Sequence, residues 1–112
     1  MRSPGPGEDL QPLTVTVTST EGVVWIEVRG EVDLSNCEQL RTSLAGIELA
    51  PASRVYLDLG LLTFCDSAGC GILLRYETDA TATGHNVKIH RASTNVRKVM
   101  SILSELEESW PR

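Results

Sequence analysis

The hydrophobic period of this chain switches repeatedly between two residues, the period of a strand, and about 3.6 residues, the period of a helix. Two runs of period two come first, at 13–19 and 23–30, and a turn at Thr20, Glu21 and Gly22 joins them into a predicted hairpin. Helices and strands then alternate along the chain. This order predicts an α/β domain with a small mixed sheet of about four to five strands, packed against about three or four helices.

Each alternating run divides its side chains between two faces. In the first run, Leu13, Val15 and Val17 share one face and threonines occupy the other, which predicts a half-buried strand. The second run places Val24, Ile26 and Val28 on one face and Trp25, Glu27 and Arg29 on the other.

The later elements follow from the same patterns. Ser35, with Glu38 three residues later, has the pattern of a capping box at the start of a helix that ends before Pro51. Gly84 is a C-terminal stop for the second helix. Further elements are strands at 54–60 and 86–90 and helices at 67–83 and 94–106.

A chain of 112 residues has room for one domain. Residues 1–11 hold two prolines and two glycines with almost no apolar side chains, so we expect a flexible N-terminal tail there and the domain at 12–112. Near the carboxyl end, Trp110 is either a cap on the core or an exposed contact.

Charge and hydropathy exclude several classes of partner. The net charge of −5 repels nucleic-acid phosphates, so no nucleic acid is expected to bind directly. No apolar run approaches the roughly 18 residues of a membrane span, so no membrane contact is expected. The first residues carry neither a secretory nor a transit pattern, and the expected location is cytoplasmic.

The three cysteines, Cys37, Cys65 and Cys70, form neither an even set nor a CxxC pair. This pattern favours neither a secreted disulfide framework nor a zinc site, and no metal or other cofactor is expected. We expect the cysteines to be small buried hydrophobic residues, with a regulatory disulfide as the alternative.

An acid, a serine and small residues interrupt the most apolar segment, Leu61–Leu74. Ser67 is expected where the run of the third strand ends and a helix begins, so the first helical amides point toward it and favour negative charge. A purely structural interpretation also fits, in which Asp66 or Ser67 caps the helix while Gly69 and Gly71 allow close packing.

The segment around Ser67 does not match the enzyme motifs that it partly resembles. The nucleophile elbow G-x-S-x-G requires glycine where Cys65 stands, and the dinucleotide motif G-x-G-x-x-G requires glycine where Leu74 stands. The candidate bases, His85 and His90, lie beside or within the last predicted strand and are expected to be surface or edge residues. The sequence therefore predicts a protein that is not an enzyme.

Three segments, VRGEVDLSNCEQLRTSL, VYLDLGLLTFCDSAGCGILLRY and NVKIHRASTNVRKVMSIL, resemble the bacterial anti-sigma factor antagonists. These proteins share the domain named for sulfate transporters and anti-sigma antagonists, the STAS domain. The likeness runs from about Leu13 to Leu106. Its most specific part is the apolar-Asp-Ser-small-Gly-apolar-Gly pattern around Ser67, supported by Gly-Glu-apolar-Asp ending at Asp33.

The resemblance implies a partner switch controlled by phosphorylation. The unmodified antagonist binds an anti-sigma factor, which is itself an ATP-dependent serine kinase, and the sigma factor is released. Phosphorylation of the serine after the Asp, here Ser67, ends the binding, and a serine phosphatase restores it. The chain itself is expected to be a monomer or a weak dimer.

The same resemblance assigns a partner-facing surface. Asp66 matches the acid before the phosphorylated serine, and Asp33 matches an acid in a nearby loop, although a turn or cap role fits Asp33 equally well. Ala68 stands where a second serine is common, which leaves one hydroxyl available. The expected partner-binding residues are Asp33, Leu34, Ser35, Asn36, Asp66, Ala68 and Gly69.

Cys65 and Cys70 replace residues that are ordinarily aliphatic in the family. Their positions suggest a redox hypothesis, in which a bond from Cys65 to Cys70 or Cys37 distorts the docking surface. The alternatives to the phosphorylation switch are therefore a redox-regulated or unphosphorylated antagonist, or a signalling scaffold that assembles STAS domains.

Overall fold

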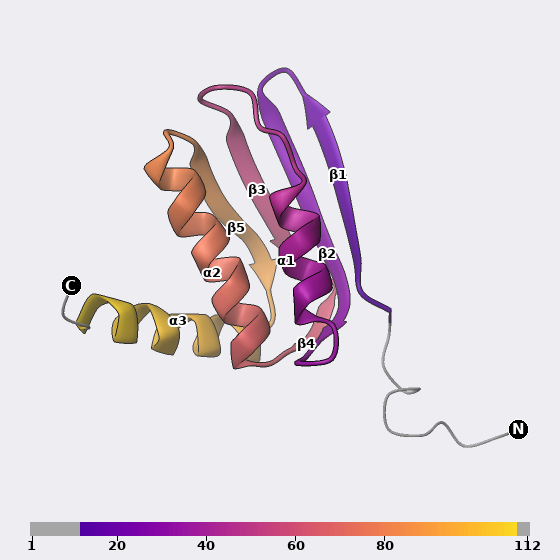
Figure 1. The fold of residues 1–112 in the computed structure, drawn as a ribbon, viewed down its shortest axis with the longest axis vertical. Coiled ribbons are helices and arrows are strands. Elements are labelled where there is room, and N and C mark those ends of the chain that lie inside the picture. Colours follow the sequence, from indigo (N-terminus) through magenta and orange to yellow (C-terminus); the bar gives the residue numbers. More distant parts are fainter. Residues whose placement is uncertain (1–11, 110–112) are drawn as a thin grey trace, which may run out of the picture.

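The first two strands form a hairpin in the computed structural model, which describes residues 12–109 (Figure 1). β1 (Thr14–Thr20) pairs antiparallel with β2 (Val23–Val32) without a break in register, from Thr14 opposite Arg29 to Thr20 opposite Val23. Glu21 and Gly22 make the turn with φ of 48° and 80°, the positive values that match the twist of two hairpin strands. The predicted hairpin is confirmed.

Parallel strands extend the sheet beyond the hairpin. The further elements, in chain order, are α1 (Cys37–Ala45), β3 (Arg54–Leu59), β4 (Leu62–Cys65), α2 (Ser67–Ala82), β5 (Asn86–Ala92) and α3 (Thr94–Ser109). β3 pairs parallel with β2 and β5 pairs parallel with β3, which gives the order β1-β2-β3-β5, while β4 pairs parallel with the end of β2. Figure 1 shows α1 and α2 lying across one face of this sheet, and α3 leaving the carboxyl end of β5. The predicted α/β fold is confirmed, with five strands and three helices within the described residues.

The core lies between the helices and the sheet face that they cover. On β2 the predicted alternation holds, because Ile26 and Val28 are fully buried while Trp25 on the opposite face is 38% exposed. On the uncovered face Trp25 stacks on Tyr56 of β3, with ring centroids 4.6 Å apart. The helices contribute the apolar residues Leu40, Leu44, Cys70, Leu73, Val96 and Met100 to the core.

The apolar run before Ser67 contains two strands, not one. After β3 the chain turns at Gly60, whose amide donates to the Asp58 carboxylate at 3.0 Å. Asp58 also accepts two hydrogen bonds from the Arg91 guanidinium of β5, at 3.2 and 2.6 Å. This ion pair holds the turn and lets β4 pair with β2. The prediction that the third strand leads directly to Ser67 is therefore wrong, because Ser67 follows β4.

The structure confirms one further prediction and corrects another. The first helix ends before Pro51, as predicted, with Ala45 as its last residue and Gly46 as its C-cap. The half-buried pattern holds at Leu13, which directly precedes β1 and is buried, and at Val15, which is partly buried against the core. The Leu13 carbonyl accepts a hydrogen bond from the Gln39 side chain of α1 at 3.3 Å. Val17 is 43% exposed, so the prediction that it shares the buried face is wrong.

Some predictions concern residues outside the described part of the chain. They are the flexible tail at 1–11 and the role of Trp110. Within residues 12–109, no helix combines the length and the hydropathy that crossing a membrane requires.

Candidate functional site

Two acidic segments meet at the carboxyl edge of β2 and β4. Val32 pairs with Cys65 in parallel register, and the Asp66 amide donates to the Val32 carbonyl at 3.1 Å. Asp33 and Asp66, which are 33 residues apart in the chain, therefore leave neighbouring strands at the same edge. The fold brings together the two loops that the sequence singled out.

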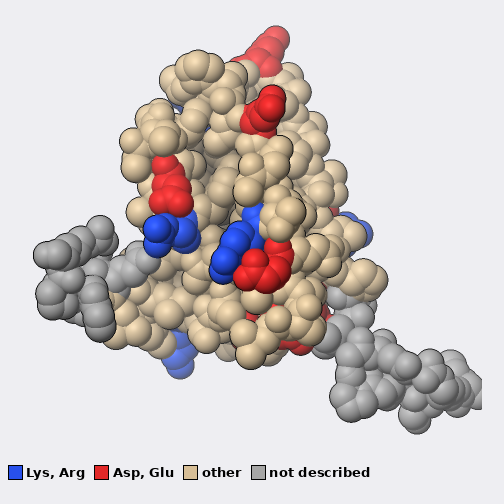
Figure 2. Space-filling view, viewed as in Figure 1, with Lys and Arg blue, Asp and Glu red and all other residues tan. Residues whose placement is uncertain are grey.

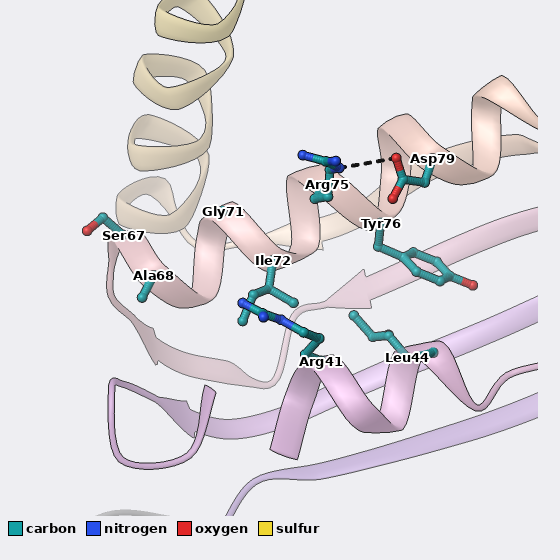
Figure 3. A pocket seen from close by; sticks show the side chains of 10 residues that line it. Arg41, Leu44, Ser67, Ala68, Gly71, Ile72, Arg75, Tyr76 and Asp79 are labelled. Carbon is teal, nitrogen blue, oxygen red and sulfur yellow. Dashed lines mark hydrogen bonds and ion pairs between the residues drawn. The ribbon is translucent and has the colours of Figure 1, made fainter. Parts of the chain in front are cut away.

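The second of these segments starts α2. Asp66 is its N-cap, and the carboxylate accepts a hydrogen bond from the Gly69 amide at 3.0 Å. The Asp66 carbonyl accepts from the Cys70 amide at 2.9 Å. Ser67 is the first helical residue and is exposed, and its hydroxyl has no hydrogen-bond partner among residues 12–109. Figure 3 shows this hydroxyl pointing away from the body of the helix.

The first segment is a tightly hydrogen-bonded loop. The Asp33 carboxylate accepts from the Ser35 hydroxyl at 2.5 Å and from the Ser35 amide at 2.8 Å. Chiefly through these bonds from Ser35, the pKa of Asp33 is lowered from its ordinary value. The Asn36 side chain closes the loop by accepting from the Asp33 amide at 2.9 Å and donating to the Glu31 carbonyl at 2.8 Å.

The capping box predicted from Ser35 and Glu38 is wrong. The N-cap of α1 is Asn36, and its side chain makes no capping hydrogen bond to the helix. The reason is competition within the loop, because Ser35 and Asn36 are both engaged with Asp33. Glu38 instead forms an ion pair with Arg41 at 3.3 Å.

Large apolar side chains are exposed near both loops. Leu34 is 79% exposed at the tip of the first loop, and Phe64 of β4 is 47% exposed opposite Glu31. Leu34 was predicted as a partner-binding residue, but Phe64 was not. Phe64 lies within an apolar run of the sequence, and such a run predicts burial for all of its residues. These two residues, with Ser67 and Ala68, all lie within three residues of the end of β2 or β4, and we call the four the Ser67 surface.

Gly69 lets the first turn of α2 approach the sheet. A Cβ atom at this position would lie 2.6 Å from Val32 Cγ1 and 2.7 Å from Cys65 Sγ, too close for either. At Gly71 a Cβ would meet nothing within 4 Å. Close packing is therefore confirmed for Gly69 and wrong for Gly71.

The three cysteines are buried and free, as expected for small hydrophobic residues. The Cys70 thiol donates a hydrogen bond to the Cys65 carbonyl, with Sγ 3.7 Å from the oxygen. Contact with the Cys70 thiol, together with burial, raises the pKa of Cys65, which disfavours the reactive thiolate there. Cys37 contacts the Leu34 carbonyl instead, at 3.8 Å. The regulatory disulfide stays a prediction.

A groove of about 680 Å³ runs between α1 and α2 and reaches Ser67 at one end (Figure 3). Figure 2 shows charged side chains gathered over these helices on an otherwise mostly uncharged face. One of the ion pairs there joins Arg75 and Asp79 at 3.2 Å.

Tyr76 also lines the groove, and its hydroxyl is buried without a hydrogen-bond partner among the described residues. Burial raises the pKa of this phenol. Other lining residues are Arg41, Leu44, Ala45, Ala68, Gly71 and Ile72.

Neither histidine lies beside Ser67. His85 follows the far end of α2, where its Nδ1 accepts from the Ser53 amide at 3.2 Å. His90 lies on the uncovered sheet face, edge-on to Trp25 at 5.0 Å. Within the described residues, no group of three or more His, Cys, Asp or Glu side chains is arranged to hold a metal ion.

A family model and several solved structures match this chain. The family model described as Mlab, STAS domain, matches residues 15–105. The solved anti-sigma factor antagonist SpoIIAA in its unphosphorylated form is 23% identical over 81% of each chain, with a TM-score of 0.61. An anti-sigma factor antagonist from Mycobacterium paratuberculosis is 24% identical, covering 89% of this chain and 84% of the other, with a TM-score of 0.62.

The same fold occurs within a much larger protein. Murine Solute Carrier 26 family member A9, an anion transporter, is 17% identical with a TM-score of 0.63, and the match covers 76% of this chain but 14% of the transporter. At these levels of identity the likenesses establish a shared fold. Function has to be argued from the site.

Proposed function

Because this chain belongs to the STAS domain family, we propose that it is an anti-sigma factor antagonist that binds its partner through the Ser67 surface. The observation that carries the proposal is the Ser67 hydroxyl, exposed and unpartnered within the described residues on the first turn of α2. Exposed Leu34 and Phe64 supply apolar area for docking. The Asp33 loop supplies a rigid polar edge beside them.

Phosphorylation of Ser67 is the proposed switch. The Ser67 oxygen attacks the γ-phosphorus of ATP, its proton goes to a base on the kinase, and ADP leaves. The anti-sigma factor itself is the proposed kinase, and a serine phosphatase returns the hydroxyl by hydrolysis. The product carries about −1.5 to −2 charges at a helix N-terminus, where the dipole and free amides favour an anion.

The effect of the phosphate falls on docking, not on the fold. The Ser67 side chain is exposed and bonds to no described residue, so adding a phosphate breaks no hydrogen bond. A docked partner, in contrast, has to bury the dianion or leave a gap around it, and burying an unpaired charge is costly. A penalty of about 3 kcal/mol weakens binding by more than about a hundredfold.

Affinity capture with four baits tests the proposal. Wild type, Ser67→Ala, Ser67→Glu and Ser101→Glu are immobilised in turn, and each is exposed to extract from the cells that make the protein. Ser101 is exposed on α3, so Ser101→Glu adds the same charge away from the Ser67 surface. We expect wild type, Ser67→Ala and Ser101→Glu to recover an ATP-binding anti-sigma factor, identified by mass spectrometry, and Ser67→Glu to lose it. Equal recovery on all four baits would contradict the proposed switch.

A further inference from the structure

The two outer strands of the sheet differ in how their free edges are protected. β5 carries Lys88 and His90, and Arg91 forms a bulge in which its φ is 55° and the register with β3 shifts. Charged side chains and bulges are the usual devices that prevent a sheet edge from pairing with another chain. β5 has both of them.

β1, at the opposite end of the sheet, has neither device. Its sequence, TVTVTST, contains only threonine, valine and serine, with no charge and no proline. Its register with β2 runs unbroken over the whole strand, so no bulge twists the edge away. Among residues 12–109, β2 is the only strand that pairs with β1, and the outer edge of β1 is left open. An open edge of strong strand formers is a template for another strand.

Val17 marks the position at which a second strand fits. It is the middle residue of β1, and it stays 43% exposed although it lies on the same side of the strand as buried Leu13. The first helix covers the start of β1, where Gln39 bonds to Leu13, and leaves Val17 uncovered. A neighbour at the outer edge would cover this apolar side chain.

We propose that β1 pairs antiparallel with β1 of a second copy of this chain, about a two-fold axis at Val17. This register places Val17 against its own copy, Thr16 against Thr18, and Thr14 against Thr20. The two copies of Val17 meet on the side of the sheet that the helices cover. The threonine pairs meet on the uncovered side, where such cross-strand pairs are favourable. Because the contact is isologous, it closes after two copies and does not form a fibre.

The dimer is weak and leaves the Ser67 surface free. A contact along one strand of 7 residues buries less than the roughly 800 Å² per partner of a standard stable interface, so we expect a dissociation constant on the order of 100 μM. β1 pairs with β2 between Val23 and Arg29, whereas the Ser67 surface begins at Phe64, opposite Glu31, and continues beyond the end of β2 at Val32. The proposal therefore does not depend on the proposed function.

Sedimentation equilibrium from about 10 μM to about 1 mM, a range that brackets the expected constant, tests the dimer. Val17→Lys places two like charges at the axis, and we expect at least a tenfold weaker association. Ile102→Lys is the matched control, because Ile102 is also a large exposed apolar residue, 51% exposed, but lies on α3. A monomer at every concentration, or a dimer weakened equally by both variants, would overturn the proposal.

Cross-linking tests the register. In Val17→Cys, two thiols at the axis are oxidised to one disulfide, and added glutathione disulfide takes up the two electrons and two protons to give two glutathiones. Ile102→Cys is the control, and the native cysteines are buried in both variants. We expect a covalent dimer to form at least tenfold faster with Val17→Cys. Equal rates would overturn the pairing, and circular dichroism on each variant confirms that the comparison is between folded chains.

Discussion

The two acidic segments at the site use their carboxylates differently, and this difference determines which serine is available. At the end of β2, Asp33 binds the hydroxyl of Ser35, two residues later. At the end of β4, Asp66 caps α2 through the Gly69 amide, and the hydroxyl of Ser67, the next residue, points away from it. A serine directly after a capping Asp is thus left open, whereas a serine two residues after an Asp in a loop is held by it.

The largest expected effect is on phosphoryl transfer. When the captured anti-sigma factor and ATP are added, we expect Ser67→Ala to lose all phosphate incorporation, because its acceptor oxygen is missing. Ser35→Ala is the matched control: it keeps the Ser67 acceptor and should still take up one phosphate, on Ser67, even if the loss of the bond to Asp33 slows docking. Intact-mass spectrometry with peptide mapping measures both. Phosphate on Ser35 in the wild-type chain would show that hydrogen bonding does not distinguish the two serines.

The next effect concerns the close contact beneath Ser67. Gly69→Ala places a Cβ 2.6 Å from Val32 Cγ1, so the start of α2 has to move, and we expect a loss of about 1–3 kcal/mol in the free energy of unfolding. Gly71→Ala, two residues later in the same helix, meets nothing within 4 Å and should be neutral or stabilising by up to about 1 kcal/mol. Urea unfolding measures both. Equal effects would mean that helix propensity, not the contact with the sheet, dominates at Gly69.

Local patterns in the sequence predicted much of this arrangement. The alternation in β2 and the start of α2 at Asp66 and Ser67 depend on neighbouring residues, and both are confirmed. The turn at Gly60 could not be predicted in this way, because it is held by Arg91, which approaches from another strand. The failed cap at Ser35 has a nearer cause, since a carboxylate two residues earlier competes for its hydroxyl.

Exposure was harder to predict than secondary structure. Phe64 and Val17 lie in apolar patterns that predict burial, yet both are exposed. Val17 lies beyond the part of β1 that α1 covers, whereas Phe64 pairs with Glu31 and points to the sheet face opposite the buried pair Val32 and Cys65. How far a helix reaches depends on its end point and on the layout of the sheet. These are tertiary properties that a residue's own neighbours in the sequence do not determine.

A smaller effect is expected from removing the carboxylate that caps α2. Asp66→Ala leaves the Gly69 amide without its acceptor, and we expect a loss of about 1 kcal/mol in the free energy of unfolding. Asp66→Asn keeps an oxygen in place and should recover most of this loss. Thermal and urea unfolding compare the two variants. If Asp66→Asn were as unstable as Asp66→Ala, the negative charge rather than the capping oxygen would be what stabilises the helix start.

The smallest effect is the titration of Asp33. Hydrogen bonds from Ser35 favour its ionised form and lower its pKa in the folded chain, so Asp33 contributes stability above its unfolded-state pKa and loses that contribution as the pH falls through the folded value. Ser35→Ala removes the hydroxyl donor and should raise the pKa of Asp33 toward its ordinary value, as measured by carboxyl-carbon NMR titration. Thr94→Ala, at the start of α3, should leave that pKa unchanged. An unchanged Asp33 pKa in Ser35→Ala would mean that the hydroxyl is not held by the carboxylate in solution, and the contrast between the two serines would then rest on exposure alone.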